Sequence, residues 1–387
     1  MILLMIFIGM ASLYISLYAG YALFVLKNSK SWDRVKKDPT FLPSVSLVIC
    51  AYNEEKTISR KLENTLEIDY PKDRLELIAL DNGSTDGTFE IAKKFEKNGV
   101  KVYSLSEENR GKSAGLNVAF KLAKGDVIAI SDVDCFLKKD VLLKSMPYFA
   151  DPSVGAVCGS QILLNPEESV STQMEDSLQS YYKLIRKAES NIDSTILYNG
   201  EFAAFRKNLI GRLDEDVGAD DTQIAIKIKE SGHRALFLNE ANFHEYAPSS
   251  SKMRWRQKVR RSSQVVQALL RYRHMMCRKR DTYSRIIYPW NVFIHVISPF
   301  IFMSLVVMLP FMFIFEPFAS ALALAIFGFT ILLGLVVIEM HWKKKLKEIL
   351  STLFMFVHAQ LTLFVGFWSL MRRKPYKWEP LKNTRRY

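Results

Sequence analysis

The chain has 387 residues, of which 49% are hydrophobic, and a formal net charge of +13. This length suits one large soluble domain together with membrane segments. Much of the positive charge falls in residues 252–285, which directly precede a long apolar segment. A basic helix lying on anionic lipid headgroups explains that position better than a nucleic-acid site does. The four cysteines show no metal-binding spacing, which argues against a zinc site or a disulfide framework.

Residues 1–26 form an uncharged apolar run. The run exceeds the ~20 residues that cross a bilayer, and it has neither a basic start nor a small-residue cleavage site. It therefore predicts a retained transmembrane anchor rather than a signal peptide. Basic residues follow it closely, namely Lys27, Lys30, Arg34, Lys36 and Lys37. By the positive-inside rule the next part of the chain faces the cytosol, so we expect an integral protein of the plasma membrane.

Residues 45–164 alternate strand and helix patterns, and a less regular part follows up to residue 250, so residues 40–250 predict one α/β domain. The strands expected are Val45–Ala51, Leu75–Leu80, Val100–Leu105, Val127–Ser131, Val154–Leu164 and Ala235–Leu238. Helices are expected between them, at Gly111–Ala123, Gln173–Glu189 and Thr222–Lys229 among others. This alternation indicates a mostly parallel sheet covered on both faces, where ligands bind beyond the carboxyl ends of the strands.

The remainder of the chain consists of two basic segments with an apolar region between them. Residues 251–285 predict a basic amphipathic helix region at the membrane interface, and residues 372–387 form a basic tail. Residues 286–371 hold three apolar stretches at about 286–315, 318–338 and 349–371, which we expect to be transmembrane or interfacial helices. The last stretch is the most polar, and the number of crossings stays open.

Acidic residues stand where predicted strands end. Asp132 and Asp134 follow Val127–Ser131, and positions i and i+2 of an extended chain point the same way, so both carboxylates can reach one divalent cation. Such a triplet is common in solvated loops, and only its place at a strand end favours the metal. Asp81 and Glu54 also follow strands and could accept hydrogen bonds from a nucleoside, although turn and helix-start chemistry explains acids there too.

Two further positions suit a charged ligand. Asn109 to Lys112 place cations at a helix start, where a diphosphate would meet backbone N–H groups. Asp220 and Asp221 begin a predicted helix, and capping alone would explain them. As a fourth acidic element of one site, however, Asp221 becomes a candidate general base.

Together these segments resemble the family 2 glycosyltransferases of GT-A fold, particularly the membrane-anchored branch that contains cellulose, hyaluronan and poly-N-acetylglucosamine synthases. The resemblance runs from about Val45 to Tyr272 and is carried by Leu47–Glu55, Asp81–Thr88, Gly111–Asn117, Asp132–Asp134, Gly200–Arg206 and Ala219–Asp221. It implies a Rossmann-like GT-A domain in the cytosol. No single segment is decisive, and their order and spacing carry the assignment.

The resemblance also implies roles for individual residues. Donor binding would fall to Ala51, Tyr52, Glu54, Asp81, Lys112 and Asp132, and the metal, Mg²⁺ or Mn²⁺, to Asp132 and Asp134. Asp221 would be the catalytic base. Asp220, Gln257, Arg260 and Arg261 would contact the acceptor or the diphosphate. Two departures stand out: Ala219-Asp220 replaces the usual Thr-Glu before the base, and Arg261 replaces the Trp of Gln-x-x-Arg-Trp, which puts processive synthesis in doubt.

The function implied is inverting transfer of a sugar from a nucleotide-diphosphate sugar, most simply a UDP-sugar, to a membrane-associated acceptor. That acceptor would be either a growing polysaccharide or a lipid. A different class stays open, a non-catalytic membrane-anchored sensor of nucleotide-sugars, but a sensor need not keep a base such as Asp221. A nucleotidyltransferase is disfavoured, because Tyr52 to Glu55 replace the Gly-rich basic loop that it needs after the first strand.

Overall fold

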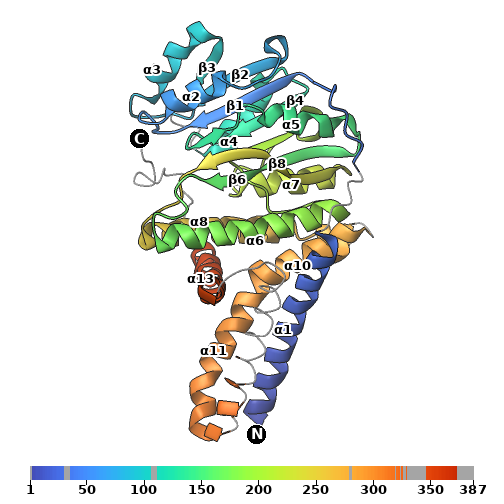
Figure 1. The fold of residues 1–387 in the computed structure, drawn as a ribbon, viewed down its shortest axis with the longest axis vertical. Helices are drawn as coiled ribbons and strands as arrows, with labels where there is room; N and C mark the ends of the chain where they lie inside the picture. Colours follow the sequence, from blue (N-terminus) through green and yellow to red (C-terminus); the bar gives the residue numbers. More distant parts are fainter. Residues whose placement is uncertain are drawn as a thin grey trace.

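In the computed structural model, an α/β domain sits on a layer of long helices from which two apolar helices project (Figure 1). The structure describes residues 2–29, 35–105, 111–278, 281–318, 320–322, 324–325, 328 and 346–372. Several predicted features lie outside these residues: Lys30 and Arg34, Asn109 and Arg110, most of the stretch 318–338, and the tail from residue 373 onward.

The α/β domain is built on one eight-stranded sheet with the order β3-β2-β1-β4-β7-β6-β8-β5. The strands are β1 (Val45–Ala51), β2 (Leu75–Asp81), β3 (Val100–Ser104), β4 (Val127–Ser131), β5 (Cys135–Leu137), β6 (Val154–Leu163), β7 (Phe202–Arg206) and β8 (Arg234–Glu245). β3, β2, β1 and β4 pair in parallel, as does β6 with β8. β7 runs antiparallel to both its neighbours, and β5 is antiparallel to β8. The predicted α/β class with a mostly parallel sheet is confirmed, with a mixed second half.

Helices cover both faces of the sheet because alternate residues of the central strands point to opposite sides. All seven residues of β1 are buried. Leu47 and Ile49 pack with α2 (Ile58–Leu66) on one face, whereas Val48 and Cys50 pack with α4 (Lys112–Leu122) on the other. The shorter helices of the domain are α3 (Thr88–Lys93), α5 (Val141–Ser145) and α7 (Asp220–Glu230), and the 3₁₀ turns are at Lys72–Arg74, Lys94–Asn98, Met146–Ala150 and Lys207–Leu209.

The predicted elements differ from the structure mainly in the second half of the domain. The strand expected at 235–238 continues to Glu245, because both β6 and β5 pair with its extension. The segment Gly200–Arg206, which carries part of the resemblance, forms a strand from Phe202 onward. The short β5 and α5 were not predicted, since three and five residues carry too little periodicity.

Two long helices form the layer beneath the sheet, α6 (Val170–Ile192) and α8 (Ser251–Arg271). α8 is the predicted basic amphipathic helix, but part of its charge points inward. Arg254 Nε lies 3.3 Å and Lys258 Nζ 2.7 Å from the Glu175 carboxylate of α6, and Arg254 is 3% exposed. These two cations therefore join the helix to the domain and are withdrawn from any contact with headgroups.

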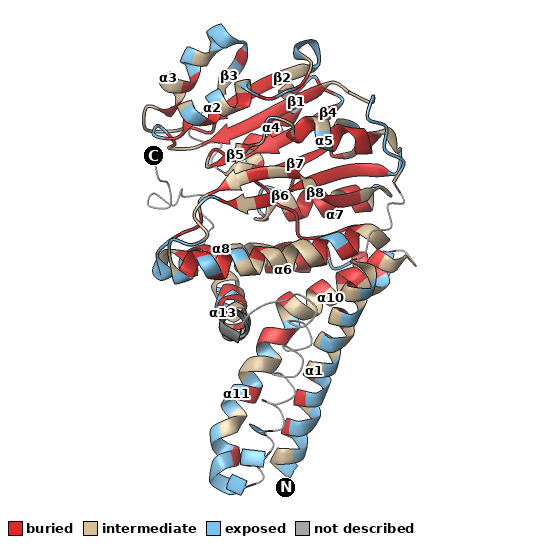
Figure 2. Cartoon of the chain, in the orientation of Figure 1, coloured by how far each residue is buried: buried red, intermediate tan, exposed pale blue. Residues whose placement is uncertain are grey.

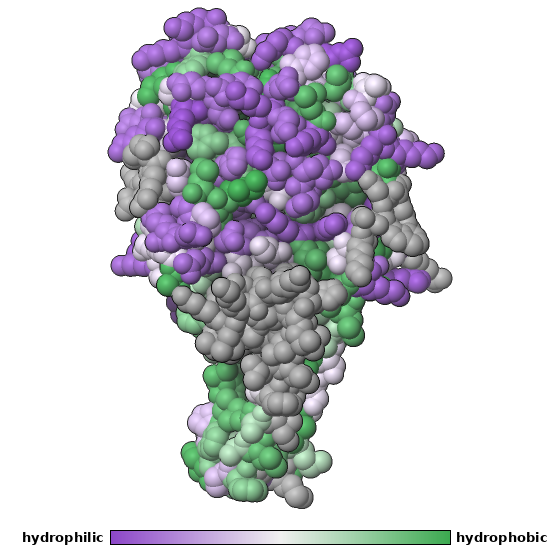
Figure 3. All heavy atoms as spheres, viewed as in Figure 1, coloured by the Kyte–Doolittle hydropathy of each residue, from purple (hydrophilic) through white to green (hydrophobic). Residues whose placement is uncertain are grey.

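Among the residues that the structure describes, three helices are long and apolar enough to cross a membrane, namely Ile2–Asn28 (α1), Tyr283–Phe315 and Phe354–Met371. The second joins two π-helical turns (Tyr283–Ile287, Phe293–Ile297) with α10 (Tyr288–Val292) and α11 (Ser298–Phe315), after the short α9 (Met275–Arg278). α1 and α11 lie side by side through Phe7, Ala11, Leu305 and Met312. Their far ends are exposed and hydrophobic, unlike the mostly hydrophilic α/β domain (Figures 2 and 3).

The third apolar helix, α13 (Leu346–Met371), takes a different direction. Figure 1 shows it nearly end-on beneath α8, whereas α1 and α11 run down the page. A small polar cluster joins all three helices: Gln360 donates to Tyr18 Oη (3.0 Å) and accepts from Ser298 Oγ (2.9 Å). α13 therefore runs across the base of the domain instead of alongside the other two helices.

A buried carboxylate fixes α1 to the helix layer. Glu189 of α6 is fully buried and accepts hydrogen bonds from Tyr21 Oη (2.6 Å), Thr195 Oγ1 (2.6 Å) and Asn291 Nδ2 (2.8 Å). These donors come from α1, from the segment after α6 and from α10. One side chain thus accepts hydrogen bonds from three segments, and without it the hydroxyls of Tyr21 and Thr195 would be buried unpaired. Asn291 Nδ2 also donates to the carbonyl of Ile287 (2.9 Å).

We expect Glu189→Leu to lower the free energy of unfolding by about 2 kcal/mol or more, because the buried hydroxyls of Tyr21 and Thr195 lose their acceptor at about 1–3 kcal/mol each. Glu189→Gln should cost less, since the amide keeps one acceptor oxygen and can donate to Thr195 Oγ1. Thermal unfolding of the full chain in detergent measures both, with Glu63→Gln on the exposed face of α2 as the control. Equal unfolding temperatures for Glu189→Leu and this control would show that the cluster contributes nothing.

Candidate active site

One cavity of about 550 Å³ lies beyond the carboxyl ends of β1 and β4. Its volume falls within the roughly 300–1,000 Å³ of small-molecule sites. At one end it is lined by Lys112, Asp132 and Asp134, and at the other by Met355 and Leu363 of α13. The cavity therefore connects the acidic edge of the sheet with the apolar helices beneath it.

Lys112, the first residue of α4, joins two of the acidic segments. Its Nζ lies 2.8 Å from Asp132 Oδ1 and 3.1 Å from Asp220 Oδ2. Burial opposes the charge of Lys112, but Asp132 and Asp220 outweigh it and hold the pKa of Lys112 well above its usual value. The ammonium is therefore permanently charged and holds the end of β4 next to the start of α7.

Asp221 is partly buried and lines the same cavity. Burial and the neighbouring Asp220 raise the pKa of Asp221 to about 7, with Lys112 acting in the opposite direction. Its Oδ1 accepts the backbone N–H of Thr222 at 2.6 Å. A carboxylate with such a pKa can both accept and hold a proton near neutral pH, as a general base must.

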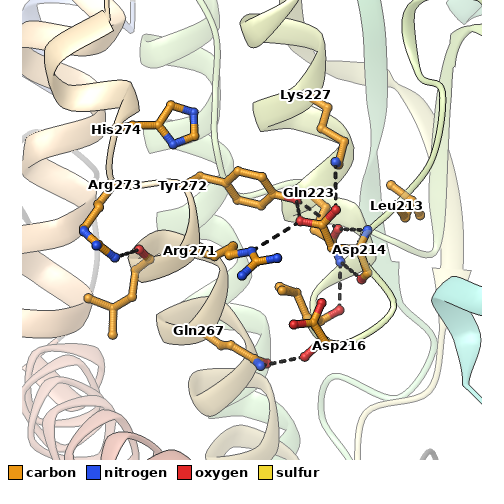
Figure 4. A network of polar contacts seen from close by, with 12 residues as sticks. Leu213, Asp214, Asp216, Gln223, Lys227, Gln267, Arg271, Tyr272, Arg273 and His274 are labelled. Atoms are coloured by element: carbon orange, nitrogen blue, oxygen red, sulfur yellow. Dashed lines mark hydrogen bonds and ion pairs between the residues drawn. The ribbon is translucent and has the colours of Figure 1, made fainter.

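The backbone before Asp221 is held in an unusual conformation. Ala219 has a φ of 54°, which is uncommon for a residue with a Cβ. Figure 4 shows how the loop before it is anchored: Asp214 accepts from Tyr272 Oη (2.8 Å) and Lys227 Nζ (3.2 Å). Gln267 of α8 donates to the carbonyl of Asp216 (2.7 Å). α7 and α8 together thus determine where Asp220 and Asp221 lie.

Asp132 and Asp134 fit a divalent cation as a partial ligand set. Both line the cavity, and the pKa of Asp132 is raised to about 6 by burial and by the nearby charge of Asp134, against the effect of Lys112. Such repulsion is relieved by a bound cation. In the described part of the chain no three His, Cys, Asp or Glu side chains form a complete metal site, so oxygens of a bound diphosphate would have to supply further ligands.

A buried lysine that the sequence did not single out makes hydrogen bonds on both sides of the loop Asp132–Asp134. Lys61 of α2 is fully buried, and its Nζ donates to Ser131 Oγ (2.7 Å) and to the carbonyl of Cys135 (2.7 Å). These two residues flank Asp132–Asp134. Nothing in the local sequence of Lys61 indicates that its side chain reaches the loop Asp132–Asp134.

Of the residues predicted to hold the nucleoside, only some line the cavity. Glu54 lines the cavity and is 4% exposed, with Thr57 Oγ1 donating to it at 2.5 Å. Asp81 is also buried and accepts from Ser104 Oγ at 2.9 Å and from the backbone N–H of Ser84. Ala51, Tyr52 and Asp81 do not line the cavity. The structure thus brings Glu54 to the cavity and leaves those three beside it.

The predicted acceptor-side residues Gln257, Arg260 and Arg261 all line the cavity from α8. Arg261 lies 2.8 Å from Glu201, a buried residue of the segment Gly200–Arg206 whose role the sequence alone does not indicate. Glu245, at the end of β8, faces the cavity too, and burial together with Glu201 raises its pKa well above the usual value. Glu245 was missed because the predicted strand ended seven residues too early.

A mixed α/β sheet with this strand order, an Asp pair at the end of β4 and a cavity open toward apolar helices defines a glycosyltransferase of GT-A fold. Residues 46–213 match the model of glycosyl transferase family 2. The matched segment runs from β1 to β7, so the α/β domain is a family 2 glycosyltransferase domain, and the chain also carries helices long enough for a membrane anchor.

The names of two similar proteins support the assignment of the domain to this family. The chain is 29% identical over 60% of its length to the probable glycosyltransferase YdaM of Bacillus subtilis, and 27% identical over 59% to the poly-beta-1,6-N-acetyl-D-glucosamine synthase of Staphylococcus aureus. It spans a little more than half of those proteins, 57% and 56%.

A solved structure extends the similarity to the apolar helices. The mannosyltransferase PcManGT of Pyrobaculum calidifontis, in complex with GDP-Man and Mn²⁺, has a TM-score of 0.73 and is 26% identical. The match covers 94% of this chain and 99% of that one. The family assignment favours an enzyme over the nucleotide-sugar sensor that the sequence had left open.

Proposed function

We propose that this protein is an inverting, metal-dependent glycosyltransferase that moves a sugar from a nucleotide-diphosphate sugar to a membrane-associated acceptor. The observation that carries the proposal is that Asp221, whose pKa is raised to about 7, lines the same cavity as Asp132 and Asp134. One cavity thus offers a carboxylate pair suited to a donor diphosphate and a separate base for an acceptor hydroxyl.

In this proposal Asp132 and Asp134 hold Mg²⁺ or Mn²⁺, which as a Lewis acid stabilises negative charge on the departing diphosphate. Lys112 adds fixed positive charge at the same place. Glu54 contacts the nucleoside from within the cavity, and Ala51, Tyr52 and Asp81 contact the part of it that extends beside the cavity. Asp221 takes the proton of an acceptor hydroxyl as its oxygen attacks the anomeric carbon from the face opposite the leaving group. The configuration at that carbon is then inverted.

The donor is proposed as a UDP-sugar, which is what the resemblance to the polysaccharide synthases implies, and the similarity to the poly-beta-1,6-N-acetyl-D-glucosamine synthase supports that resemblance. A second candidate, GDP-mannose, is favoured by a specific observation, the similarity over nearly the whole chain to a mannosyltransferase in complex with GDP-Man and Mn²⁺. The acceptor is a growing polysaccharide or a lipid. Lys27 at the end of α1 supports a domain on the cytosolic side of the plasma membrane.

Incubating membranes that contain the full chain with labelled UDP-sugars and GDP-mannose tests the donor and the acceptor together. Label in organic solvent would identify a lipid product, and label in insoluble material a polymer. We expect Asp221→Asn to reduce this transfer by about 10²–10⁴-fold, the usual contribution of a general base, while donor affinity stays nearly unchanged. Wild-type rates in Asp221→Asn would remove the base assignment, and no transfer from any donor would refute the function.

The pH dependence of the rate follows from the raised pKa of Asp221. Below pH 7 this carboxyl is protonated and cannot accept a proton, so the rate should rise about tenfold per pH unit and level off above pH 7. The charged groups that act most strongly on its pKa are Asp220, which raises it, Lys112, which lowers it, and Glu201, which raises it. Asp220→Asn removes a like charge, and the rising limb should therefore move to lower pH. Initial rates between pH 5 and 9 measure this, and an unchanged limb in Asp220→Asn would contradict the assignment.

Metal dependence is tested through donor binding. We expect Asp134→Ala to abolish the part of nucleotide-diphosphate affinity that requires Mn²⁺, because one of two protein ligands is lost. Equilibrium dialysis of labelled UDP and GDP with and without Mn²⁺ measures it. Asp73→Ala, on an exposed 3₁₀ turn of the same domain, is the matched control. Equal Mn²⁺ enhancement in the two variants would exclude Asp134 as a ligand.

A further inference from the structure

The cavity extends beyond Asp221 into a chamber formed by α6 and the segment after it. Gln179, Tyr182 and Arg186 line it from α6, and Tyr198 from that segment. Gln179, Arg186 and Tyr198 are 5%, 6% and 3% exposed. None of these residues was singled out by the sequence, and the mechanism proposed above uses none of them.

Three of these side chains carry a buried polar atom that lacks a hydrogen-bond partner among the residues described: Gln179 Oε1, Arg186 Nη1 and Tyr198 Oη. A buried polar group left unpaired is costly, and native structures contain few of them. Three in the walls of one cavity indicate a ligand that supplies the missing partners.

The orientation of Gln179 shows which kind of ligand fits. Although burial opposes it, Lys258 and Arg254 lower the pKa of Glu175 to about 2, so this carboxylate is ionised and only accepts hydrogen bonds. Gln179 must therefore turn its amide N–H to Glu175, at 3.1 Å, which leaves Oε1 as the unpaired atom. An acceptor oxygen needs a donor from the ligand. A hydroxyl provides one, whereas an ionised phosphate does not.

The other two side chains complement a set of hydroxyls. Arg186 Nε donates to the carbonyl of Leu197 (2.6 Å), and its Nη1 is still available as a donor. Tyr198 Oη can donate or accept, because burial raises the pKa of Tyr198 well above its usual value and keeps it protonated. The chamber therefore offers a hydrogen-bond acceptor (Gln179 Oε1), a donor (Arg186 Nη1) and a hydroxyl that can do either (Tyr198 Oη). Together with the aromatic ring of Tyr182, these groups suit a ligand ring that has an apolar face and carries several hydroxyls.

The chamber lies directly next to the reacting carboxylate. Gly200 is two residues after Tyr198, and a Cβ at Gly200 would lie 3.4 Å from the Asp221 side chain. The opposite end of the cavity is lined by Met355, Ala359 and Leu363 of α13. A ring held in the chamber would thus have Asp221 at one end and apolar side chains at the other.

We propose that Gln179, Arg186 and Tyr198 bind a sugar ring of the acceptor, so that the acceptor is a saccharide, borne either by a lipid or by a free glycan. This inference rests on the proposed function and specifies its acceptor. A lipid phosphate without a sugar would leave Gln179 Oε1 unpaired and is the alternative that the test must separate.

The test uses the full chain in nanodiscs, prepared in a detergent without sugar. Saturation-transfer NMR titrations give the Kd of hexyl glycosides of glucose, galactose, mannose and N-acetylglucosamine, and of hexyl phosphate. We expect at least one glycoside to bind more tightly than hexyl phosphate. Tyr198→Phe should raise the Kd of that glycoside about fivefold, the usual effect of one lost hydrogen bond, and should leave the unfolding temperature unchanged or higher.

Tyr283→Phe is the matched control. Its hydroxyl is also buried without a partner in the described part of the chain, but Tyr283 does not line the cavity, so glycoside affinity should stay at the wild-type value. The proposal is overturned if no glycoside binds, if hexyl phosphate binds more tightly than every glycoside, or if Tyr198→Phe and Tyr283→Phe have the same Kd.

One further comparison distinguishes a lipid-borne sugar from a free glycan, and another distinguishes failure of the acceptor site from failure of the proposed function. Tighter binding of a hexyl than of the matching methyl glycoside supports a lipid-borne sugar, and equal affinity supports a free glycan. Labelled donor turnover is measured on the same samples. Turnover without glycoside binding refutes the acceptor site alone, and glycoside binding without turnover of any donor refutes the proposed function.

Discussion

The arrangement of the site depends on one cation between two carboxylates. Lys112 ties Asp132, at the end of β4, to Asp220, at the start of α7. Without it, Asp132, Asp134, Asp220 and Asp221 would bring several negative charges to one partly buried place, where repulsion is strong. Since β4 and α7 are almost ninety residues apart, this contact joins the two halves of the domain, and the position of Asp221 relative to the Asp pair follows from it.

Much of the first half of the domain could be predicted from the sequence, because parallel strands buried on both faces read as short β-branched runs. β1 and β4 have the predicted bounds, and the acids that follow them reach one cavity. The second half was harder: β8 is interrupted by polar residues and pairs with two different strands, so its extension to Glu245 has no simple period. Lys61 and Arg186 could not be found, since their importance arises only from contacts outside their own helices.

The basic helix α8 shows why composition alone misleads. Its cations were assigned to the membrane surface, yet Arg254, Lys258 and Arg261 pair with Glu175 and Glu201 inside the protein. These pairs lie between the sheet and α13, where unpaired charge would be costly. By fixing Glu175 as an anion they also orient Gln179 in the cavity wall. The same residues that give the chain its basic character therefore shape the interior of the site.

The Glu189 cluster has a practical consequence for handling the protein. Because Tyr21 of α1 is one of its three donors, the N-terminal helix is an integral part of the folded catalytic unit and cannot be treated as a detachable tether. A fragment trimmed at residue 40 to improve solubility would uncover the apolar side of α6 around Ile185 and Ala188, which Tyr21 and Val25 cover in the intact chain. Such a fragment would be prone to aggregate, and purification should retain the whole polypeptide in a lipid or detergent environment.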